Sequence, residues 1–458
     1  MLTFPRCFAN SNRCFLLEID IFTDMKLHTK IFIGMVFGIL AGLVIKNLGL
    51  QQDTVDVIVK WVDPIGKIFM NLIFMMVIPL ILSALILGIA EIGDVKKLGR
   101  MGGKLLIYTI IVSFIAVLIG ITMVNVFNPG KTISPETREY LVNEFGAEAA
   151  MANAQAEANK ADERTAGDVI AQIIPRNPFE EMANAFNSAH TGGGLLSVMF
   201  FALIFGVAMA AVGPEKTATL KSFLEGLYEV VIKVIGYAMA LAPYGVAALL
   251  FNMVLNVGAD FLISLLWYVL VVLAALAIHQ FVVYSIILKY FAKRNPVQFM
   301  KDMGEVTLTA FSTSSSNATL PTAIRVSIEK LKIPKPIAHF VLTIGSTGNQ
   351  NGTALFEGIT VLFLAQVFNV DLSIGSQITV VLLCILAGVG TAGVPGGSLP
   401  VIVTILISIG VPGEAIALIY GVDRILDMSR TTLNVNGDIT AAAYIQYTEE
   451  KAGRIPEE

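Results

Sequence analysis

The sequence predicts an all-α polytopic membrane protein, and its composition is the first reason. Hydrophobic residues make up 55% of the 458 residues and charged residues only 14%, whereas soluble domains average about 25% charged residues. Apolar runs of about 18 residues or more recur along the chain, and each run is long enough to span a bilayer. Polar clusters also interrupt several of these runs, so some of the membrane helices are expected to be broken.

Most of the uninterrupted apolar runs lie before residue 292. A kink is expected at Pro79 and a helix end at Pro243, because proline removes a backbone donor. A basic loop is expected at 96–104. The predicted spans in this part are 30–48, 63–93, 105–127, 195–212, 216–242, 244–256 and 260–291.

Two segments are expected to lie outside this helical array. Residues 131–192 contain ten acidic and five basic residues, and they predict a solvated extracellular insertion with some helix. Residues 1–24 lack the basic region, the apolar core and the cleavage site of a signal peptide. We expect these residues to be disordered or a mis-assigned N-terminus, with Met25 as the natural start.

The distribution of basic residues predicts the orientation. Cytoplasmic loops carry an excess of lysine and arginine, which here concentrate near residues 26–30, 96–104, 293–301, 325–335 and 451–454. Both termini are therefore expected in the cytoplasm and the acidic insertion outside. This orientation fits the number of spans only if the segment near 302–330 enters and leaves the membrane on the cytoplasmic side.

Residues 302–330 have the composition of such a re-entrant hairpin, with a hydroxyl-rich tip at Ala310–Pro321. The Gly- and Pro-rich residues 387–398 predict the tip of a second hairpin. Between the two tips, an apolar span at 336–368 is interrupted at 345–353. Irregular backbone at membrane depth survives only where it is buried in protein or lines a cavity. Paired interruptions therefore predict an inverted repeat with a binding site between its halves.

The stretch 421–438 is unusually polar for a membrane helix. Its positions 427, 430, 431, 434 and 438 recur at spacings of three and four, so they share one helix face. A charge at the centre of a membrane helix costs about 2.5–3.5 kcal/mol, which suggests that these charges are used. The face suits a small zwitterion with an extra acid group, together with a cation. The alternative is ion pairing that only holds helices together.

The residue types on this face indicate how a ligand would bind. Arg430 can hold a carboxylate through two parallel hydrogen bonds, and Asp427 can accept hydrogen bonds from an ammonium. Asp438 and Asn434, with carbonyls near Gly345 and Asn349, offer oxygen ligands to a hard cation.

Glu357 follows the interruption by one turn and has no basic neighbour in sequence. A carboxyl in apolar surroundings can carry a proton, and we predict this role for Glu357. A protonated residue that only packs helices is the alternative.

Other chemistries find little support. The three cysteines and four histidines are scattered, without metal-ligand spacing, so His279 and His339 are interpreted as structural. No basic cluster suggests nucleic acid as a partner. No nucleophile–base pair or nucleotide-binding loop suggests an enzyme.

Four motifs in this order resemble the glutamate/aspartate transporter family, the dicarboxylate/amino acid:cation symporters, in its bacterial type. The motifs are STSSSNATLP, GNQNGTALFEG, GTAGVPGG and DMSRTTLNVNGD. The resemblance implies a homotrimer in the lipid bilayer of the cell (inner) membrane. Each protomer would have eight transmembrane segments and two re-entrant helical hairpins. A mobile transport domain would carry substrate by an elevator motion along a static trimerisation scaffold.

The resemblance also divides the chain into segments. A scaffold is expected from spans 1 and 2 and from the trimerisation helices, at 25–104 and 193–256. A cytoplasmic tail is expected at 451–458. The transport domain would comprise span 3, span 6, hairpin 1, span 7, hairpin 2 and span 8, at 105–130, 257–294, 295–335, 336–370, 371–412 and 413–450.

Site roles follow from the resemblance, position by position. Arg430 would bind the side-chain carboxylate of the substrate and Asp427 its amino group. Val394 and Gly396 would lie on the second hairpin, which would act as the extracellular gate. The pocket would be completed by Thr431, Asn434, Thr353 and the backbone around Ser315 and Ser316.

The resemblance implies two sodium sites and one proton carrier. Glu357 matches the glutamate that carries a proton in vertebrate members. One sodium site would use Asp438, Asn349 and Asn434, and a second would use carbonyls near Thr347, Gln350 and Thr391.

A third sodium site of the family is degenerate here. The family motif usually reads Asn-Met-Asp-Gly-Thr, whereas this chain has the sequence NQNGT, so Asn351 replaces the acidic ligand. Thr109 and Val112 replace a tyrosine and a threonine, and only Ser113 is retained. We therefore expect this site to bind sodium poorly.

A second departure concerns an arginine. The first hairpin carries Ser314 where archaeal members have arginine, and the last helix carries Arg424 instead. Arg424 is expected to pair with Asp427 or Asp423.

The expected function is secondary active symport of glutamate or aspartate, with proton coupling through Glu357 in place of at least one sodium. No cofactor is expected beyond the co-transported sodium or proton. One alternative keeps the fold and transports C4-dicarboxylates, although Asp427 would repel a dianion that lacks an amine. An alternative from another class is an anion channel, which does not need the paired acid–base pocket.

Overall fold

The computed structural model gives a helical chain. All elements in the described part are helices or short helical turns. The predicted N-terminal segment, most of the acidic insertion and the tip of the second hairpin lie outside the described residues. The structure describes residues 25, 27–93, 95–145, 174–184, 194–257, 260–390 and 398–453.

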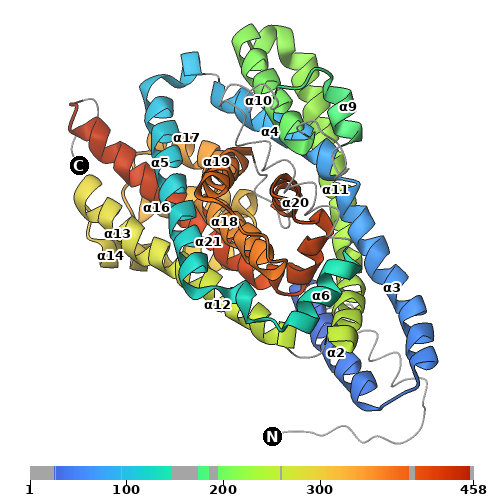
Figure 1. Cartoon of the computed structure of the whole chain (residues 1–458). Coiled ribbons are helices and arrows are strands. Elements are labelled where there is room, and N and C mark those ends of the chain that lie inside the picture. The colour runs from blue at the N-terminus through green and yellow to red at the C-terminus, as the bar shows by residue number, and fades with distance from the viewer. Residues whose placement is uncertain are drawn as a thin grey trace, which may run out of the picture.

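One group of helices packs along the longest helix, α11. Helix α11 contacts α2, α3 and α4, and α10 packs against α4. Figure 1 shows α3 and α11 running along one edge of the molecule. The members of this group are α2 (Leu27–Asn47), α3 (Gln52–Phe74), α4 (Val77–Gly93), α10 (Gly194–Val212) and α11 (Pro214–Val257).

Glycines allow α2 to approach α11 closely. A Cβ atom added at Gly34 would lie 2.2 Å from the carbonyl oxygen of Pro243, and one at Gly38 would lie 2.3 Å from that of Ala247. Gly42 continues the same spacing of four residues against Phe251. Small residues at this spacing are typical of close helix pairs in membranes, because they let two backbones touch.

The second group surrounds α18 and α21, which lie at its centre in Figure 1. Helix α18 packs against α5, α19 and α21, and α21 also contacts α12, α15, α16 and α17. The members of this group are α5 (Val95–Phe127), α12 (Asp260–Ile278), α15 (Gly304–Thr313), α16 (Ser316–Glu329), α17 (Lys335–Gly348), α18 (Asn351–Val367), α19 (Ile374–Gly390), α20 (Leu399–Ser408) and α21 (Tyr420–Glu450).

Short elements join these helices. The π-helical segments η2 and η3 extend α12, and the remaining elements are turns or short helices. They are η1 (Pro129–Thr132), α6 (Pro135–Glu144), α9 (Pro178–Ala183), η2 (His279–Val283), α13 (Tyr284–Ile286), η3 (Ile287–Phe291), α14 (Pro296–Asp302) and η4 (Gly413–Ile419).

Five helical segments of the described residues are long and apolar enough to cross a membrane. Two shorter apolar helices lie at Ser197–Val212 and Ile374–Leu386. The five long segments are Thr29–Asn47, Asp53–Gly88, Arg100–Thr132, Pro214–Asn256 and Phe261–Phe291.

One proline prediction was confirmed and one was wrong. Within the segment Asp53–Gly88 the helix is interrupted at Met75–Met76, one turn before Pro79, as a proline kink there predicts. Pro79 itself lies in the first turn of α4. That position suits proline, because backbone N–H groups in the first turn have no intrahelical acceptor. Helix α11 continues through Pro243. Packing against neighbouring helices tolerates the single lost backbone bond at membrane depth.

Two predicted boundaries were also wrong. Helix α3 begins at Gln52, eleven residues before the predicted start at 63, and α5 begins at Val95. The basic residues 96–104 are therefore helical and do not form a loop. Arg100 and Lys104 form ion pairs with Glu449 near the end of α21. These pairs hold the first turns of α5 against α21.

The interruption predicted at 345–353 is confirmed. Helix α17 ends at Gly348 and α18 begins at Asn351, with Asn349 and Gln350 between them. A tight turn also separates α15 from α16, where Ser314 adopts a left-handed conformation with φ of 50°. Helices α15 and α16 contact each other and α21, as do α17 and α18, so both of these breaks lie between helices that pack against α21.

Candidate functional site

The polar residues predicted on one face of α21 are all buried. Asp427, Arg430, Thr431, Asn434 and Asp438 each have 5% or less of their surface exposed. Helix α21 runs without a break from Tyr420 to Glu450, so the spacing of three and four residues brings these side chains onto one face. Arg430 and Asn434 contact α18, and Asp438 contacts Asn349 at the end of α17. Asp427 lines a small cavity with residues of α2 and α11.

Arg430 is bound by two carboxylates and one aromatic ring. Its Nη1 lies 3.2 Å from Asp423 Oδ1, and its Nη2 lies 2.9 Å from Asp427 Oδ1. The guanidinium carbon lies 4.3 Å from the centre of the Phe356 ring, within the range of a cation–π contact. Buried charges require such partners, because isolated ions pay a large desolvation penalty.

A second arginine completes this charge cluster. Arg424 Nη1 lies 3.3 Å from Asp427 Oδ2, so the predicted pairing of Arg424 with Asp427 is confirmed. Asp423, Asp427, Arg424 and Arg430 together carry two negative and two positive charges. These groups point at one another, as the ion-pair interpretation expected. A charged ligand at this point would have to exchange with an existing partner.

Asn434 joins α21 to the first turn of α18. Its Oδ1 accepts hydrogen bonds from the backbone N–H groups of Gly352 (2.7 Å) and Thr353 (3.4 Å). Its Nδ2 donates to Gln350 Oε1 (2.5 Å) and to Thr353 Oγ1 (3.0 Å). The first amides of a helix have no intrahelical acceptor, so Asn434 caps α18 from outside. The lack of a side chain at Gly352 permits this close approach of α18 to α21, since a Cβ there would lie 2.6 Å from Arg430 O.

One turn further along α21, Asp438 meets the end of α17. Asn349 Nδ2 donates to Asp438 Oδ1 at 2.8 Å, and a Cβ at Gly345 would lie 2.5 Å from the same carboxylate oxygen. Asn349 Oδ1 is buried and has no hydrogen-bond partner among the described residues. A small cavity of about 20 Å³ between α5 and α17 is lined by Asn349, Gly345 and Thr109. Carboxylate and amide oxygens here offer ligands to a hard cation.

Two of the residues predicted for a degenerate third sodium site, Ser113 and Asn351, are hydrogen-bonded to each other. Ser113 Oγ donates to Asn351 Oδ1 at 2.7 Å. Asn351 Nδ2 donates to Tyr284 Oη at 3.2 Å, and the Tyr284 hydroxyl donates to Leu433 O at 3.2 Å. Thr109 and Val112 are buried on the same helix as Ser113. Tyr284 was not predicted, because it comes from the segment after α12 and no spacing connects it to the motif.

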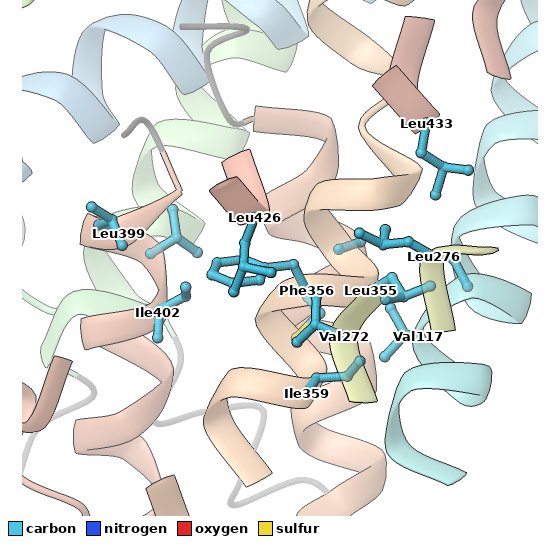
Figure 2. Packing of buried hydrophobic residues seen from close by; sticks show 14 of the residues in the cluster. Val117, Val272, Leu276, Leu355, Phe356, Ile359, Leu399, Ile402, Leu426 and Leu433 are labelled. Carbon is cyan, nitrogen blue, oxygen red and sulfur yellow. The ribbon is translucent and has the colours of Figure 1, made fainter. Parts of the chain in front are cut away.

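Glu357 lies in the apolar interior of the second helix group. It is fully buried, and neither carboxylate oxygen has a hydrogen-bond partner among the described residues. Gly358 next to it packs against Val117 of α5 and lies near Cys384 of α19. Figure 2 shows how apolar side chains surround this part of α18. Those labelled on α5, α12, α20 and α21 are Val117, Val272, Leu276, Leu399, Ile402, Leu426 and Leu433, around Leu355, Phe356 and Ile359 of α18.

The remaining predicted residues are placed as follows. Ser315 is the N-cap residue of α16, and its side chain accepts a hydrogen bond from Ala318 N. Ser316 is buried. Thr347 lies in the last turn of α17, where its hydroxyl donates to Ile344 O. Thr391, Val394 and Gly396 lie outside the described residues. His279 is buried edge-on against Tyr284 with ring centres 4.8 Å apart, and His339 is exposed on α17.

Sequence reasoning missed two groups that hold Arg430. Asp423 was noted only as a possible partner of Arg424, and Phe356 was not noted at all. Asp423 lies seven residues before Arg430, which places both on one helix face after two turns. That spacing was available in the sequence. The Phe356 contact crosses from α18 to α21 and has no comparable local signal.

Comparison with known proteins decides which family this arrangement represents. The profile of the sodium:dicarboxylate symporter family matches residues 27–448. The chain belongs to this family. Its membership confirms the resemblance that the four motifs indicated. Members of the sodium:dicarboxylate symporter family are transporters, which agrees with the expected class.

Three relatives show the range of names in the sodium:dicarboxylate symporter family. The proton/sodium-glutamate symport protein of Bacillus caldotenax is 34% identical over 427 residues, which cover 92% of this chain and 95% of the relative. The proton/glutamate-aspartate symporter of Escherichia coli is 34% identical over 432 residues, 94% of each chain. The C4-dicarboxylate transport protein of Bacillus subtilis is 32% identical over 429 residues, 93% of this chain and 94% of the relative.

Proposed function

We propose that this chain is a secondary active symporter of acidic amino acids, glutamate or aspartate, coupled to protons, sodium or both. The observation that carries the proposal is the buried pair of Arg430 and Asp427 beside the break between α17 and α18. At this spacing, the guanidinium can bind a carboxylate of a zwitterion and the carboxylate can bind its ammonium group. Relatives named as glutamate and glutamate-aspartate symporters support the substrate class.

Binding would replace the two ion pairs of Arg430 by two ion pairs with the substrate. The side-chain carboxylate of the substrate takes the Nη donors of Arg430 that now bind Asp423 and Asp427. Asp427 is then free to accept hydrogen bonds from the substrate ammonium. Thr431, Thr353, Asn434 and the backbone at Ser315 and Ser316 complete the pocket, with Val394 and Gly396 on the gate. A substrate that lacks either charged end leaves one buried charge unpaired, which is strongly unfavourable.

The charge balance explains why a cation must accompany the substrate. The four charged groups at Arg430 already sum to zero, and an acidic amino acid brings a net charge of −1. A buried uncompensated charge costs several kcal/mol. A proton or a sodium ion removes this cost, so binding of the substrate is coupled to binding of a cation.

Two groups of residues would hold the cations. Asp438, Asn349 and Asn434 form the first sodium site, supported by Asn349 Oδ1, which has no partner in the part of the chain that the structure describes. Carbonyls near Thr347, Gln350 and Thr391 form the second. Glu357 carries the proton, supported by its full burial without a hydrogen-bond partner in the described chain.

The third sodium site is proposed to be lost. Ser113, Asn351 and Tyr284 form a continuous chain of hydrogen bonds. Their mutual pairing needs no ion, and Asn351 supplies no negative charge to balance one. Thr109 and Val112 take the places of the family's tyrosine and threonine, which removes an aromatic partner and one hydroxyl ligand.

The family architecture is proposed for the whole assembly. Eight transmembrane segments and two re-entrant hairpins, at 295–335 and 371–412, would form each protomer of a homotrimer in the inner membrane, with both termini cytoplasmic. The division of the helices into a group on α11 and a group around α21 supports a static scaffold and a mobile transport domain. An elevator motion would then carry the whole α21 group.

C4-dicarboxylates are the second candidate substrate class. A C4-dicarboxylate transport protein is among the relatives. In addition, Arg424 and Arg430 both pair with Asp427, which reduces the repulsion that this carboxylate would exert on an amine-free dianion. Competition of labelled aspartate uptake by succinate distinguishes the two classes.

Uptake into proteoliposomes tests the proposal. Labelled aspartate and glutamate are offered with an inward sodium gradient, an inward proton gradient or neither. We expect accumulation with at least one gradient, a response to the proton gradient, and weak competition by succinate. Currents without substrate accumulation would contradict symport and favour a channel. Accumulation of labelled succinate without accumulation of either amino acid would favour the dicarboxylate class.

A further inference from the structure

The side chain of Gln350 lies inside the break between α17 and α18 and is 2% exposed. Its Nε2 donates to Ser346 O at 3.0 Å. Its Oε1 accepts two hydrogen bonds, from Asn434 Nδ2 at 2.5 Å and from Thr353 Oγ1 at 3.3 Å. The carboxamide oxygen therefore occupies the point at which two side-chain donors converge.

Both donors belong to residues that are proposed to hold the substrate. Asn434 cannot turn its amide elsewhere, because its Oδ1 is bound by the N–H groups of Gly352 and Thr353. The second hydrogen on its Nδ2 is directed to Thr353 Oγ1 at 3.0 Å. As long as Gln350 Oε1 stays in place, neither Asn434 nor Thr353 has a donor left for a ligand.

We propose that Gln350 Oε1 occupies the subsite of one substrate carboxylate oxygen, and that the substrate binds by displacing it. This inference rests on the proposed function and adds a residue that sets its affinity. With the side-chain carboxylate on Arg430, the oxygen at this subsite belongs to the α-carboxylate. Hydrogen bonds to an ionised acceptor are roughly twice as strong as those to a neutral one. A carboxylate oxygen therefore replaces the amide oxygen of Gln350 favourably.

Displacement makes Gln350 an internal competitor of the substrate. The family motif usually has methionine at this position, and a thioether sulfur is only a weak acceptor. Methionine would leave Asn434 and Thr353 free, whereas glutamine holds them until a stronger acceptor arrives. The chain accordingly gives up affinity for acidic substrates at this position.

The test compares two Gln350 variants with the full-length wild-type protein. Gln350→Met removes the strong acceptor and nearly conserves volume, and Gln350→Glu replaces it with a charged acceptor of the same shape. Binding of L-aspartate and L-glutamate to purified protein is measured by calorimetry at fixed pH and saturating sodium. Gln366→Met serves as the control, because Gln366 lies near the far end of α18 and bonds to Gly130, Val124 and Asn128.

We expect Gln350→Met to lower the Kd by about tenfold, which corresponds to about 1.4 kcal/mol, and Gln350→Glu to raise it. Gln366→Met should leave the Kd within about twofold. A purely structural role for Gln350 predicts weaker binding in both variants, so an unchanged or raised Kd in Gln350→Met overturns the inference. If the methionine variant does not fold, an unchanged or lowered Kd in Gln350→Glu overturns it. Wild-type protein that binds neither amino acid would instead contradict the proposed function.

Discussion

At the scale of single residues, the site brings together groups whose net charge is already balanced. Arg430 is shared between Asp423 and Asp427, and Arg424 binds Asp427 from the other side. Breaking a buried ion pair by removal of one partner typically costs about 3–5 kcal/mol. The substrate must therefore replace existing partners of Arg430 and Asp427, because neither charged group is unpaired.

Glu357→Gln tests the proposed proton carrier. The amide keeps the size of the side chain but cannot take up or release a proton. We expect uptake by the variant to lose its response to an imposed proton gradient and to retain its response to sodium. The measurement is labelled aspartate uptake into proteoliposomes under each gradient separately.

Gln366→Met on the same helix is the control for that variant, since Gln366 bonds to the end of α5 and lies away from the charge cluster. Unaltered dependence on the proton gradient in Glu357→Gln would show that another group carries the proton.

Asn351→Asp tests the loss of the third sodium site. The new carboxylate would lie beside Ser113 Oγ and Tyr284 Oη, where three oxygens could share a sodium ion. We expect sodium to raise the Tm of the variant more than that of the wild type, by a few degrees at saturation. An identical sodium response in both proteins would mean that the loss of the acidic ligand does not explain the degenerate site.

The sequence predicted the residues of this site better than their partners. Spacing on one helix placed Asp427, Arg430 and Asn434 together, and the break at Asn349–Gln350 followed from local composition. The contacts of Phe356 with Arg430 and of Tyr284 with Asn351 join different helices. Such contacts depend on how helices are packed, which local patterns do not encode.

At the scale of elements, the close pair of α2 and α11 depends on glycine. Gly38→Leu would force a side chain into the backbone of Ala247, because even a Cβ would lie 2.3 Å from its carbonyl oxygen. Overpacking of this kind typically costs about 1–3 kcal/mol. We expect a clearly lowered Tm in detergent, measured by thermal unfolding.

Gly226→Leu is the matched control, since a Cβ at Gly226 on α11 would meet nothing within 4 Å. It should leave the Tm unchanged or slightly raised, because leucine favours helix more than glycine does. Equal losses in both variants would show that close approach of α2 and α11 is not what the glycine provides.

Proline shows why element boundaries were harder to predict than element types. Pro79 and Pro243 have the same local chemistry, yet one lies in a first helical turn and the other inside a continuous helix. The difference arises from tertiary packing, which decides whether a missing hydrogen bond ends a helix. Similarly, α5 extends back to Val95, where Arg100 and Lys104 find Glu449 on a distant helix.

At the scale of the whole molecule, the number of coupled cations decides how voltage acts. One elementary charge moved through 100 mV is worth about 2.3 kcal/mol. A substrate of charge −1 carried with one proton moves no net charge, whereas a second cation at Asp438 makes the cycle electrogenic. With both cations bound, an interior-negative potential should accelerate uptake.

A potassium diffusion potential imposed with valinomycin measures this effect in proteoliposomes. We expect faster aspartate uptake with a negative interior in the wild type and little voltage dependence in Asp438→Asn. Voltage-independent uptake in the wild type would limit the cycle to one cation per substrate.

The central claim is that Arg430 is kept in the protein interior to bind the substrate carboxylate. Arg430→Lys tests it most directly, because lysine retains the charge for Asp423 and Asp427 but lacks the planar fork that binds a carboxylate bidentately. Calorimetric binding of L-aspartate to the folded variant is the measurement. We expect the Kd to rise by about a hundredfold, or about 2.7 kcal/mol. An unchanged Kd in a folded Arg430→Lys protein would contradict the claim and leave Arg430 as a structural partner of the two aspartates.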